Sequence, residues 1–580
     1  MQQSDRVAIA AVGMGGVGKT TLAWRYVQQH RADYPGGICW LSFGQLVTEL
    51  LTFVGRSIGL EDLPSEWNEA QVVQHYLARW EVRWPGKKLL VLDDVGEYEA
   101  VAGFLPRQGA FQVVMTTRVQ MQPTSGRAMQ RLQQLPLDVL RPSAAFKLLR
   151  QLLDDDDRLG AEVAAAKELC TWLGYLPLGI EVTAGLLRVE PDWTIAKLLD
   201  DLKRQQMQHE AMSEVEAAFE LSWQRLSGAE QQLAMVMSLF ALAPIPWGLV
   251  EQVVAQYRVV LPAVPGWKRL WRKQTAPEQW CDLVEERVLV QGRRQLVKLS
   301  LLNREGEARY QLHGLVRAFL LGKLAASETA ESAETAEAGV ALKLTVGFAQ
   351  AMTEIAKTVS QTVTVEGRER IVEVVPHLEE VAAHRTAVLA DDDKTWCCTG
   401  LARFYKSLNL WTEAERCCKR SLAISKAELG DRHPDTAQGL NNLALLYESQ
   451  GRYGEAEPLY LDALAIWKAE LGDRHPDTAT SLNNLAGLYA SMGRYGEAEP
   501  LYLDALAISK AELGDRHPYT AGSLFNLAAL YYNTQRHQQA LDHIRQALDI
   551  YIPALGTDHP TTQAANSWLQ GIQQAINEVE

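Results

Sequence analysis

One eight-residue stretch near the start of the chain constrains its fold more than any other feature. Residues 13–20, Gly-Met-Gly-Gly-Val-Gly-Lys-Thr, fit the phosphate-loop template G-x-x-x-x-G-K-[ST]. The apolar run 7–12 before them predicts a buried strand, and the helical spacing of apolar residues in 21–27 predicts a helix after them. We therefore expect an α/β domain whose first loop joins a strand end to a helix start.

The residue types in this loop suit a bound phosphate chain. Glycines let backbone N–H groups turn inward around an anion, and the helix start adds the positive end of its dipole. Lys19 supplies a charge near the outer phosphates, and Thr20 offers a hydroxyl to Mg²⁺. The expected ligand is a nucleoside di- or triphosphate, and the alternative is a Gly-rich turn with a chance Lys-Thr.

Length and composition point to several folded domains. The chain has 580 residues, 47% hydrophobic and 22% charged, with a net charge of −14. Residues 396–580 hold 15 Lys and Arg against 22 Asp and Glu, a difference of −7, which argues against nucleic acid as their main partner. No apolar run approaches the length of a membrane span and no cleavable leader opens the chain, so we expect a cytoplasmic protein without membrane contact.

Seven cysteines show no disulfide framework, which fits a reducing compartment. The pairs Cys397-Cys398 and Cys417-Cys418 lack the C-x-x-C spacing of a zinc site. We expect them to be small buried helix residues rather than metal ligands.

Two further apolar runs complete the predicted nucleotide site. Residues 89–92 predict a central strand that ends in Asp93 and Asp94, where one carboxylate can hold Mg²⁺ and the other can orient a water molecule. Residues 112–117 predict another buried strand, after which Arg118 can sense a γ-phosphate. Read alone, these residues would be an acidic turn and a surface cation.

The ordered set of segments resembles the NB-ARC branch of the STAND NTPases, the regulated ATPases of plant resistance proteins, apoptotic scaffolds and bacterial signalling proteins. The resemblance covers about the first 320 residues and rests on residues 13–23, 37–41, 89–94, 113–118 and 173–178. Residues 218–226 resemble the start of that family's winged-helix domain, and 310–317 resemble its Met-His-Asp segment.

The resemblance implies a role for each matching position. The phosphates of ATP or ADP would be held by Gly13, Gly15, Gly16, Val17, Gly18, Lys19, Thr20 and Thr21. Thr20 and Asp93 would hold Mg²⁺, Asp94 would orient water, and Arg118 would read the γ-phosphate. Pro177 would pack against adenine, while His313 would touch the β-phosphate of ADP and keep a closed state, unless it is a structural histidine.

Two departures from the family pattern stand out. Gly314 replaces the acidic residue usual after the histidine, so the interdomain clasp is expected to be weaker or made differently. The chain also begins twelve residues before Gly13, where the family has an adenine-covering segment and an effector domain. A fragment, a misplaced start and an effector on a separate chain all fit the sequence.

Internal repeats are the second strong signal. His433, His475, His517 and His559 each precede a proline and are 42 residues apart, with helical patterns and a glycine break between them. The period and residues resemble tetratricopeptide repeats of the kinesin-light-chain kind, which stack into a superhelix with a concave groove. The histidines are expected to cap helices rather than bind metal.

Two repeated columns are candidates for groove and packing residues. The family resemblance implies that Asn442, Asn484 and Asn526 face the groove and bind a peptide backbone, although repeat packing is an equal alternative. For the second column, packing is the favoured interpretation: Tyr447, Tyr489 and Tyr531.

The full prediction is a multidomain chain, α/β then helical and winged-helix then an all-α superhelix. The expected divisions are a nucleotide-binding domain (1–135), a helical domain (136–210), a winged-helix domain (211–322), a linker with bridging helices (323–395) and the repeats (396–580).

The predicted function is an ATP/ADP switch in which the repeats sense a ligand or protein and nucleotide exchange drives opening or oligomerisation. Slow ATP hydrolysis would reset it. The alternative is a peptide-binding repeat scaffold with a structural nucleotide module. DNA reading by the winged helix is a weaker third option, because residues 211–322 show no basic recognition helix that is free of the predicted ADP contact.

Overall fold

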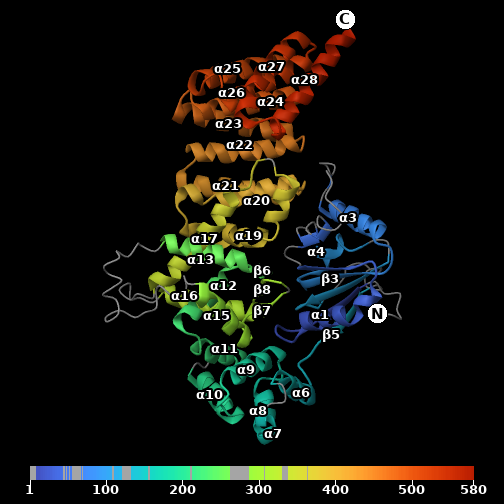
Figure 1. Ribbon diagram of the computed structural model, residues 1–580, viewed down its shortest axis with the longest axis vertical. Coiled ribbons are helices and arrows are strands. Elements are labelled where there is room, and N and C mark those ends of the chain that lie inside the picture. Colours follow the sequence, from blue (N-terminus) through green and yellow to red (C-terminus); the bar gives the residue numbers. More distant parts are fainter. Residues whose placement is uncertain are drawn as a thin grey trace. The chain divides into compact units, whose positions relative to one another are not determined.

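The computed structural model describes most of the chain (Figure 1). The described residues are 8–42, 46, 49–50, 53–54, 67, 69–106, 110–120, 132–153, 157–208, 212–260, 286–305, 307–329, 338–361 and 363–579. They divide into two structural units, of which the first ends at Asp393 and the second begins at Lys394. Val7, which belongs to the predicted first strand, lies outside the described residues.

A five-stranded parallel sheet in the order β2-β3-β4-β1-β5 forms the first domain. Its strands are β1 (Ala8–Val12), β2 (Ile38–Ser42), β3 (Lys88–Val95), β4 (Phe111–Thr117) and β5 (Leu132–Pro136). The accompanying helices are α1 (Lys19–His30), α3 (Glu69–Arg83) and α4 (Tyr98–Ala102). The inner strands are continuous apolar runs because a parallel sheet is buried on both faces.

The third strand differs from the prediction in one respect. It passes through Asp93 and Asp94 to Val95 instead of ending at the two acids. The pairing with β4 shifts register between Leu92 and Val95, and Asp94 has a left-handed φ of 54°. A bulge therefore takes Asp93 and Asp94 out of the pairing with β4, while Asp93 still pairs with Ser42 of β2 and the buried Val95 keeps the strand attached to the core.

Helices follow the sheet. The first group comprises α6 (Pro142–Leu152), α7 (Asp157–Ala161), α8 (Val163–Trp172), α9 (Pro177–Val189) and α10 (Ile195–Gln208). The second comprises α11 (Glu214–Gln224), α12 (Gly228–Leu239), α13 (Trp247–Val260), α15 (Glu286–Lys298) and α16 (Gly314–Thr329). Ser213 and Ser227 start α11 and α12 with capping boxes.

A small antiparallel sheet accompanies the second helical group, as expected of a winged helix. Its order is β6-β8-β7, with β6 at Ile245–Pro246, β7 at Asn303–Arg304 and β8 at Arg309–Gln311. This hairpin lies next to the residues that lead into α16.

Helix α16 extends into the range predicted as a linker with bridging helices. Helix α16 continues to Thr329 because the buried side chains of Val316, Leu320 and Leu324 recur every four residues. Residues 330–337 lie outside the described residues. The bridging helices then follow as α17 (Ala338–Lys357), α18 (Val365–Ile371) and α19 (Val375–His384).

The second unit consists of helix pairs in the described range 394–579. Its helices are α20 (Trp396–Ser407), α21 (Trp411–Leu429), α22 (Pro434–Ser449), α23 (Tyr453–Leu471), α24 (Pro476–Ser491), α25 (Tyr495–Leu513), α26 (Pro518–Asn533), α27 (His537–Leu555) and α28 (Pro560–Val579). His433, His475 and His517 cap α22, α24 and α26, because each Nδ1 accepts the backbone N–H two residues on.

The tyrosine column joins consecutive repeats. The guanidinium of Arg452 lies 4.0 Å from the ring centroid of Tyr447 and 2.7 Å from a carboxylate oxygen of Glu415 in the preceding repeat. The same three-residue cluster recurs as Arg494, Tyr489 and Glu457 and as Arg536, Tyr531 and Glu499. Because the rings are buried, the tyrosines pack the repeats together, as predicted.

The paired cysteines are buried in α20 and α21. Burial raises the pKa of Cys398 to about 11 and that of Cys418 to about 12. These thiols are therefore packing residues of low reactivity.

Candidate nucleotide-binding site

The phosphate loop leaves β1 at a position that accepts only glycine. The Gly13 N–H donates to the Thr117 carbonyl at 3.2 Å, and a Cβ on Gly13 would lie 2.5 Å from the Leu137 carbonyl oxygen. Gly16 and Gly18 have φ values of 76° and 92°, in the left-handed region. The loop backbone is thus set by neighbouring strands and by glycines.

The phosphate loop carries backbone N–H groups that have no hydrogen-bond acceptor among the described residues. Within the described part of the chain, the backbone N–H groups from Gly15 to Thr20 donate to no protein atom. Lys19 Nζ donates to the Gly13 and Met14 carbonyls at 2.8 Å each. Burial and the nearby Arg118 charge lower the pKa of Lys19. A row of unsatisfied N–H groups at a helix start, next to an ammonium group, is a site for an anion.

Carboxylate and hydroxyl groups meet at the carboxyl edge of the sheet. Thr20 Oγ1 donates to Asp93 Oδ1 at 3.0 Å, which joins the start of α1 to the end of β3. Thr116 on β4, which the sequence interpretation did not single out, donates its hydroxyl to Asp93 and accepts the Asp94 N–H at 2.9 Å. Because β4 lies between β1 and β3, it is the strand able to bridge them.

Asp94 and Arg118 form a pair of their own. Arg118 Nε lies 3.2 Å from Asp94 Oδ1, and both side chains are more than half exposed. The predicted water-orienting acid and the predicted γ-phosphate sensor therefore hold each other at the rim of the site. An anion could compete for this guanidinium at modest cost, because exposed ion pairs are weak.

Two other domains contact the loop. Pro177, the first residue of α9, lies so that its Cγ is 3.7 Å from the position of a Cβ on Gly18. Leu178 and Leu315 approach Gly16 in the same way, at 3.6 and 3.5 Å. Leu315 is at the start of α16, so the helical and the winged-helix domains both contact the loop. Both leucines belong to the segments 173–178 and 310–317 of the family resemblance, but the sequence interpretation gave neither a role.

His313 lies just before α16 and faces the loop. Its Nδ1 accepts the Leu315 N–H at 3.2 Å, so the neutral ring carries its proton on Nε2. Burial and the positive charges of Arg118 and Lys19 lower the pKa of His313 to about 4. The ring is thus a neutral hydrogen-bond donor near the phosphate loop.

Two carboxylates that the sequence interpretation missed lie near Asp93. Glu49 accepts the Ser42 N–H at 2.5 Å. Burial raises the pKa of Glu49 to about 7, although the Ser42 hydrogen bond acts to lower it. Glu305, between β7 and β8, has a pKa raised by burial and by the charge of Asp93. Neither belongs to a motif, so only the folded chain could show them.

The three predicted groove asparagines occupy one position on α22, α24 and α26. Asn484 Nδ2 donates to Asn441 Oδ1 of the preceding repeat at 2.9 Å, and Asn442 accepts from Gln438 at 2.9 Å. All three are half-buried. Asn484 thus bonds to the preceding repeat and Asn442 to its own, and all three side chains stay partly exposed.

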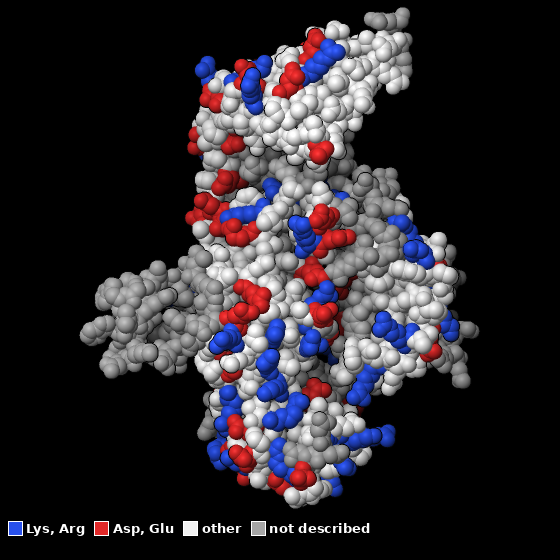
Figure 2. All heavy atoms as spheres, in the orientation of Figure 1, with Lys and Arg blue, Asp and Glu red and all other residues white. Residues whose placement is uncertain are grey.

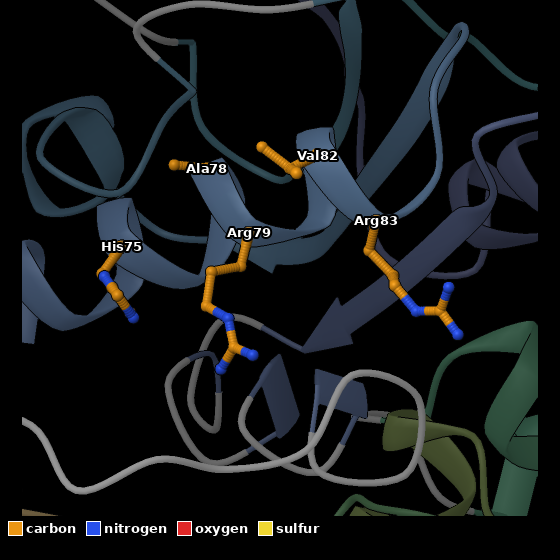
Figure 3. Close-up of a pocket in the computed structure, with 5 residues that line it drawn as sticks. All are labelled: His75, Ala78, Arg79, Val82 and Arg83. Atoms are coloured by element: carbon orange, nitrogen blue, oxygen red, sulfur yellow. The ribbon is translucent and has the colours of Figure 1, made fainter.

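A separate hollow of about 510 Å³ lies along α3 (Figure 3). Its lining is His75, Ala78, Arg79, Val82 and Arg83. None of the predicted nucleotide-binding residues lines this hollow, so it is separate from the phosphate loop.

Charge and hydropathy limit other assignments. On the face shown in Figure 2, both Lys or Arg and Asp or Glu side chains lie at the surface of the described residues. Across those residues, no group of three or more His, Cys, Asp or Glu side chains is arranged as a metal cluster. No described helix has the length and hydropathy of a membrane span.

Comparison with known families agrees with both units. The family model of the NB-ARC domain matches residues 1–157, and that of the tetratricopeptide repeat matches 394–469, 440–511 and 477–552. The chain carries an NB-ARC domain and C-terminal tetratricopeptide repeats. An NB-ARC domain implies nucleotide binding, and the unsatisfied N–H groups and the Thr20–Asp93 pair fit a phosphate chain and its metal ion.

Individual relatives share parts of this chain. The regulatory protein AfsR of Streptomyces coelicolor is 28% identical over 353 residues, which are 58% of this chain and 31% of AfsR. The disease resistance protein RPP8 of Arabidopsis thaliana is 29% identical over 209 residues, 32% of this chain and 22% of RPP8. The chain thus matches about a third or less of the length of these relatives.

Two solved structures are also similar. A Signal Transduction ATPase with Numerous Domains (STAND) protein with a tetratricopeptide repeat sensor, from Pyrococcus horikoshii, is 17% identical, with 97% of this chain and 83% of that one covered and a TM-score of 0.36. A putative kinesin light chain from Podosopora anserina with nearly identical repeats is 27% identical over 33% of this chain and 90% of that one, with a TM-score of 0.29.

Proposed function

We propose that this protein is a signalling switch whose state is set by adenine nucleotide in the NB-ARC domain. The observation that carries the proposal is the contact of Pro177 and Leu315 with the phosphate loop. Because two further domains contact the loop, the exchange of one nucleotide for another on the loop can change how they pack.

The chain's own residues have distinct tasks in this proposal. Backbone N–H groups of residues 15–20 and Lys19 bind the phosphates, while Thr20 and Asp93 hold Mg²⁺, which neutralises phosphate charge when bound. Asp94 and Arg118 exchange their mutual ion pair for water and γ-phosphate. Neutral His313 would donate a hydrogen bond from Nε2–H to the β-phosphate of ADP and so favour the closed arrangement.

The repeats supply the input in this proposal. The name of the AfsR relative describes a regulatory protein, and the repeats offer a surface for a protein or peptide. A ligand can shift the equilibrium only through its preference for the open state, and about a 10⁴-fold preference moves it from mostly closed to mostly open. Opening or oligomerisation is the output, and slow hydrolysis in a cytoplasmic setting is the reset.

Size-exclusion chromatography of the full chain tests the proposal. Its elution is compared with ADP and with a non-hydrolysable ATP analogue, together with Mg²⁺. We expect the two nucleotides to give different hydrodynamic sizes, and Lys19→Ala to lose both nucleotide binding and the difference. Lys167→Ala, an exposed change on α8, is the control. Bound nucleotide retained by Lys19→Ala would contradict the assigned role of the loop.

One observation favours a second function, a peptide scaffold with a structural nucleotide module. The repeats form a unit of their own, joined internally by the Arg-Tyr-Glu clusters. If nucleotide changes neither the hydrodynamic size nor the affinity of the repeats for a partner, the scaffold is the correct assignment.

A further inference from the structure

Two consecutive repeats are nearly identical, so their few differences are informative. Residues 430–471 and 472–513 differ at six of their 42 aligned positions. The differing pairs are Gln438/Thr480, Gly439/Ser481, Leu445/Gly487, Glu448/Ala490, Gln450/Met492 and Trp467/Ser509. These six positions are the places where the two repeats can differ in their contacts and surface.

Two of the differing residues meet across the repeat boundary. A Cβ on Gly487 would lie 3.8 Å from Glu448 Oε1 and 3.5 Å from the Tyr502 hydroxyl. A leucine at this position, as in the preceding repeat, would fill the space above both groups. Gly487 therefore leaves the carboxylate and the phenol uncovered by a side chain at this position, and we call this place the Glu448 pit.

The polar groups of the Glu448 pit have hydrogen-bonding capacity to spare. Glu448 Oε2 accepts from the Tyr460 hydroxyl at 2.7 Å, but in the described range 394–579 nothing donates to Oε1. The Tyr502 hydroxyl has no hydrogen-bond partner there either, although Tyr502 is 5% exposed. Glu448 is half-buried, so its free oxygen is within reach of a ligand that supplies hydrogen-bond donors.

Among the described residues 394–579, no cationic side chain forms an ion pair with the Glu448 carboxylate. Burial raises the pKa of Glu448, and the Tyr460 hydrogen bond and the charge of Lys406 oppose that rise. Lys406 acts from a distance, because it forms no ion pair with Glu448 within 4.0 Å. Position 448 is alanine in the next repeat and tyrosine in the one after, so the carboxylate occurs once along this column.

The pit lies beside the asparagine column. Asn441, Leu445 and Glu448 are spaced i, i+4 and i+7 and share one face of α22, and Leu445 on that face is 36% exposed. Helices α22 and α24 contact each other, and Asn484 reaches across to Asn441. An extended chain along the asparagines would therefore pass the mouth of the pit.

We propose that the Glu448 pit binds the Lys or Arg side chain of a peptide that lies along Asn442, Asn484 and Asn526. The inference rests on the proposed binding of a peptide by the repeats and names its class, a basic one. A cationic head supplies the donors that Glu448 Oε1 lacks and can also donate to the Tyr502 oxygen. Because the pit occurs once, it fixes the register of the peptide, which a uniform asparagine column cannot do.

The test uses a positional-scanning peptide library on the full-length protein. Nonapeptides carry one fixed residue at each position in turn, and binding is read from fluorescently labelled protein. We expect Lys and Arg to be selected at one position. Glu448→Gln and Gly487→Leu should each remove this selection, with a loss of about 30-fold or more for the selected basic peptide. Glu470→Gln, an exposed change on α23, is the control.

Fold integrity and groove binding are measured in parallel. Gly487→Leu copies the preceding repeat, and Glu448→Gln keeps the side-chain volume, so thermal unfolding should change little. Glu448→Lys should replace the basic selection with an acidic one. If peptide binding depends on Asn484 but shows no basic selection, the proposed Glu448 pit is wrong and the proposed peptide groove stands. The same conclusion follows if the basic selection survives Glu448→Gln. Absence of any peptide binding that depends on Asn484 overturns the proposed sensing function itself.

Discussion

His313 should make the first unit sensitive to acid. Burial with Arg118 and Lys19 nearby lowers the pKa of His313 from its ordinary 6.5 to about 4. His313→Asn removes the titration while an amide oxygen can still accept the Leu315 N–H that His313 Nδ1 accepts now. Comparison of the wild type with His313→Asn therefore separates the effect of protonating His313 from the effect of its hydrogen bond to the Leu315 N–H.

The size of the effect follows from linkage. The unfolded chain binds a proton at His313 more readily than the folded chain, so this contribution to stability is present above pH 6.5 and is lost as the pH falls towards 4. Between pH 7 and pH 5, a shift of this size corresponds to a loss of about 2 kcal/mol in the free energy of unfolding. Over the same pH interval, the free energy of unfolding of His313→Asn should fall by about 2 kcal/mol less than that of the wild type.

Urea unfolding followed by tryptophan fluorescence at pH 5, 6 and 7 measures the difference. The relevant transition is the one that ADP shifts, and the other histidines contribute equally to both proteins. Saturating ADP should reduce the pH dependence of the wild type, because a phosphate near Nε2 raises the pKa of His313. Equal pH dependence of wild type and variant without nucleotide would refute the buried, neutral histidine.

Three further outcomes follow from other contacts. Thr116→Val should weaken Mg²⁺-dependent nucleotide binding about 10- to 100-fold by calorimetry, because it removes the hydroxyl that bonds Asp93 and Asp94, while Thr116→Ser should not. Gly314→Asp should slow release of a fluorescent ADP about fivefold, since a Cβ there would lie 3.7 Å from Arg118 Nη2; faster release would contradict this. In the repeats, burial pushes the pKa of Glu415 up, but hydrogen bonds from Lys419, Arg452 and Tyr447 outweigh it and lower the pKa to about 2. The loss of thermal stability in Glu415→Gln should therefore be present above pH 4.5 and shrink towards pH 2, and a loss that is constant over that range would argue against the ion cluster.

The sequence alone determined the elements that local pattern controls. The phosphate loop between β1 and α1, the buried strands and the helix pairs of the repeats follow from spacing, because each element's period and its caps are written in neighbouring residues. Motif chemistry likewise pointed to Asp93, Asp94 and Arg118, since the carboxyl ends of parallel strands share one edge.

Tertiary structure decided which groups meet. Thr116, Leu315, Glu49 and Glu305 reach the site from separate elements, and no spacing along the chain encodes those approaches. The Glu448 pit arises in the same way, from a glycine in one repeat and a carboxylate in the one before it. Local sequence sets which helices and strands form, whereas burial and packing between distant segments set the pKa values, the orphan donors and the cavities on which function depends.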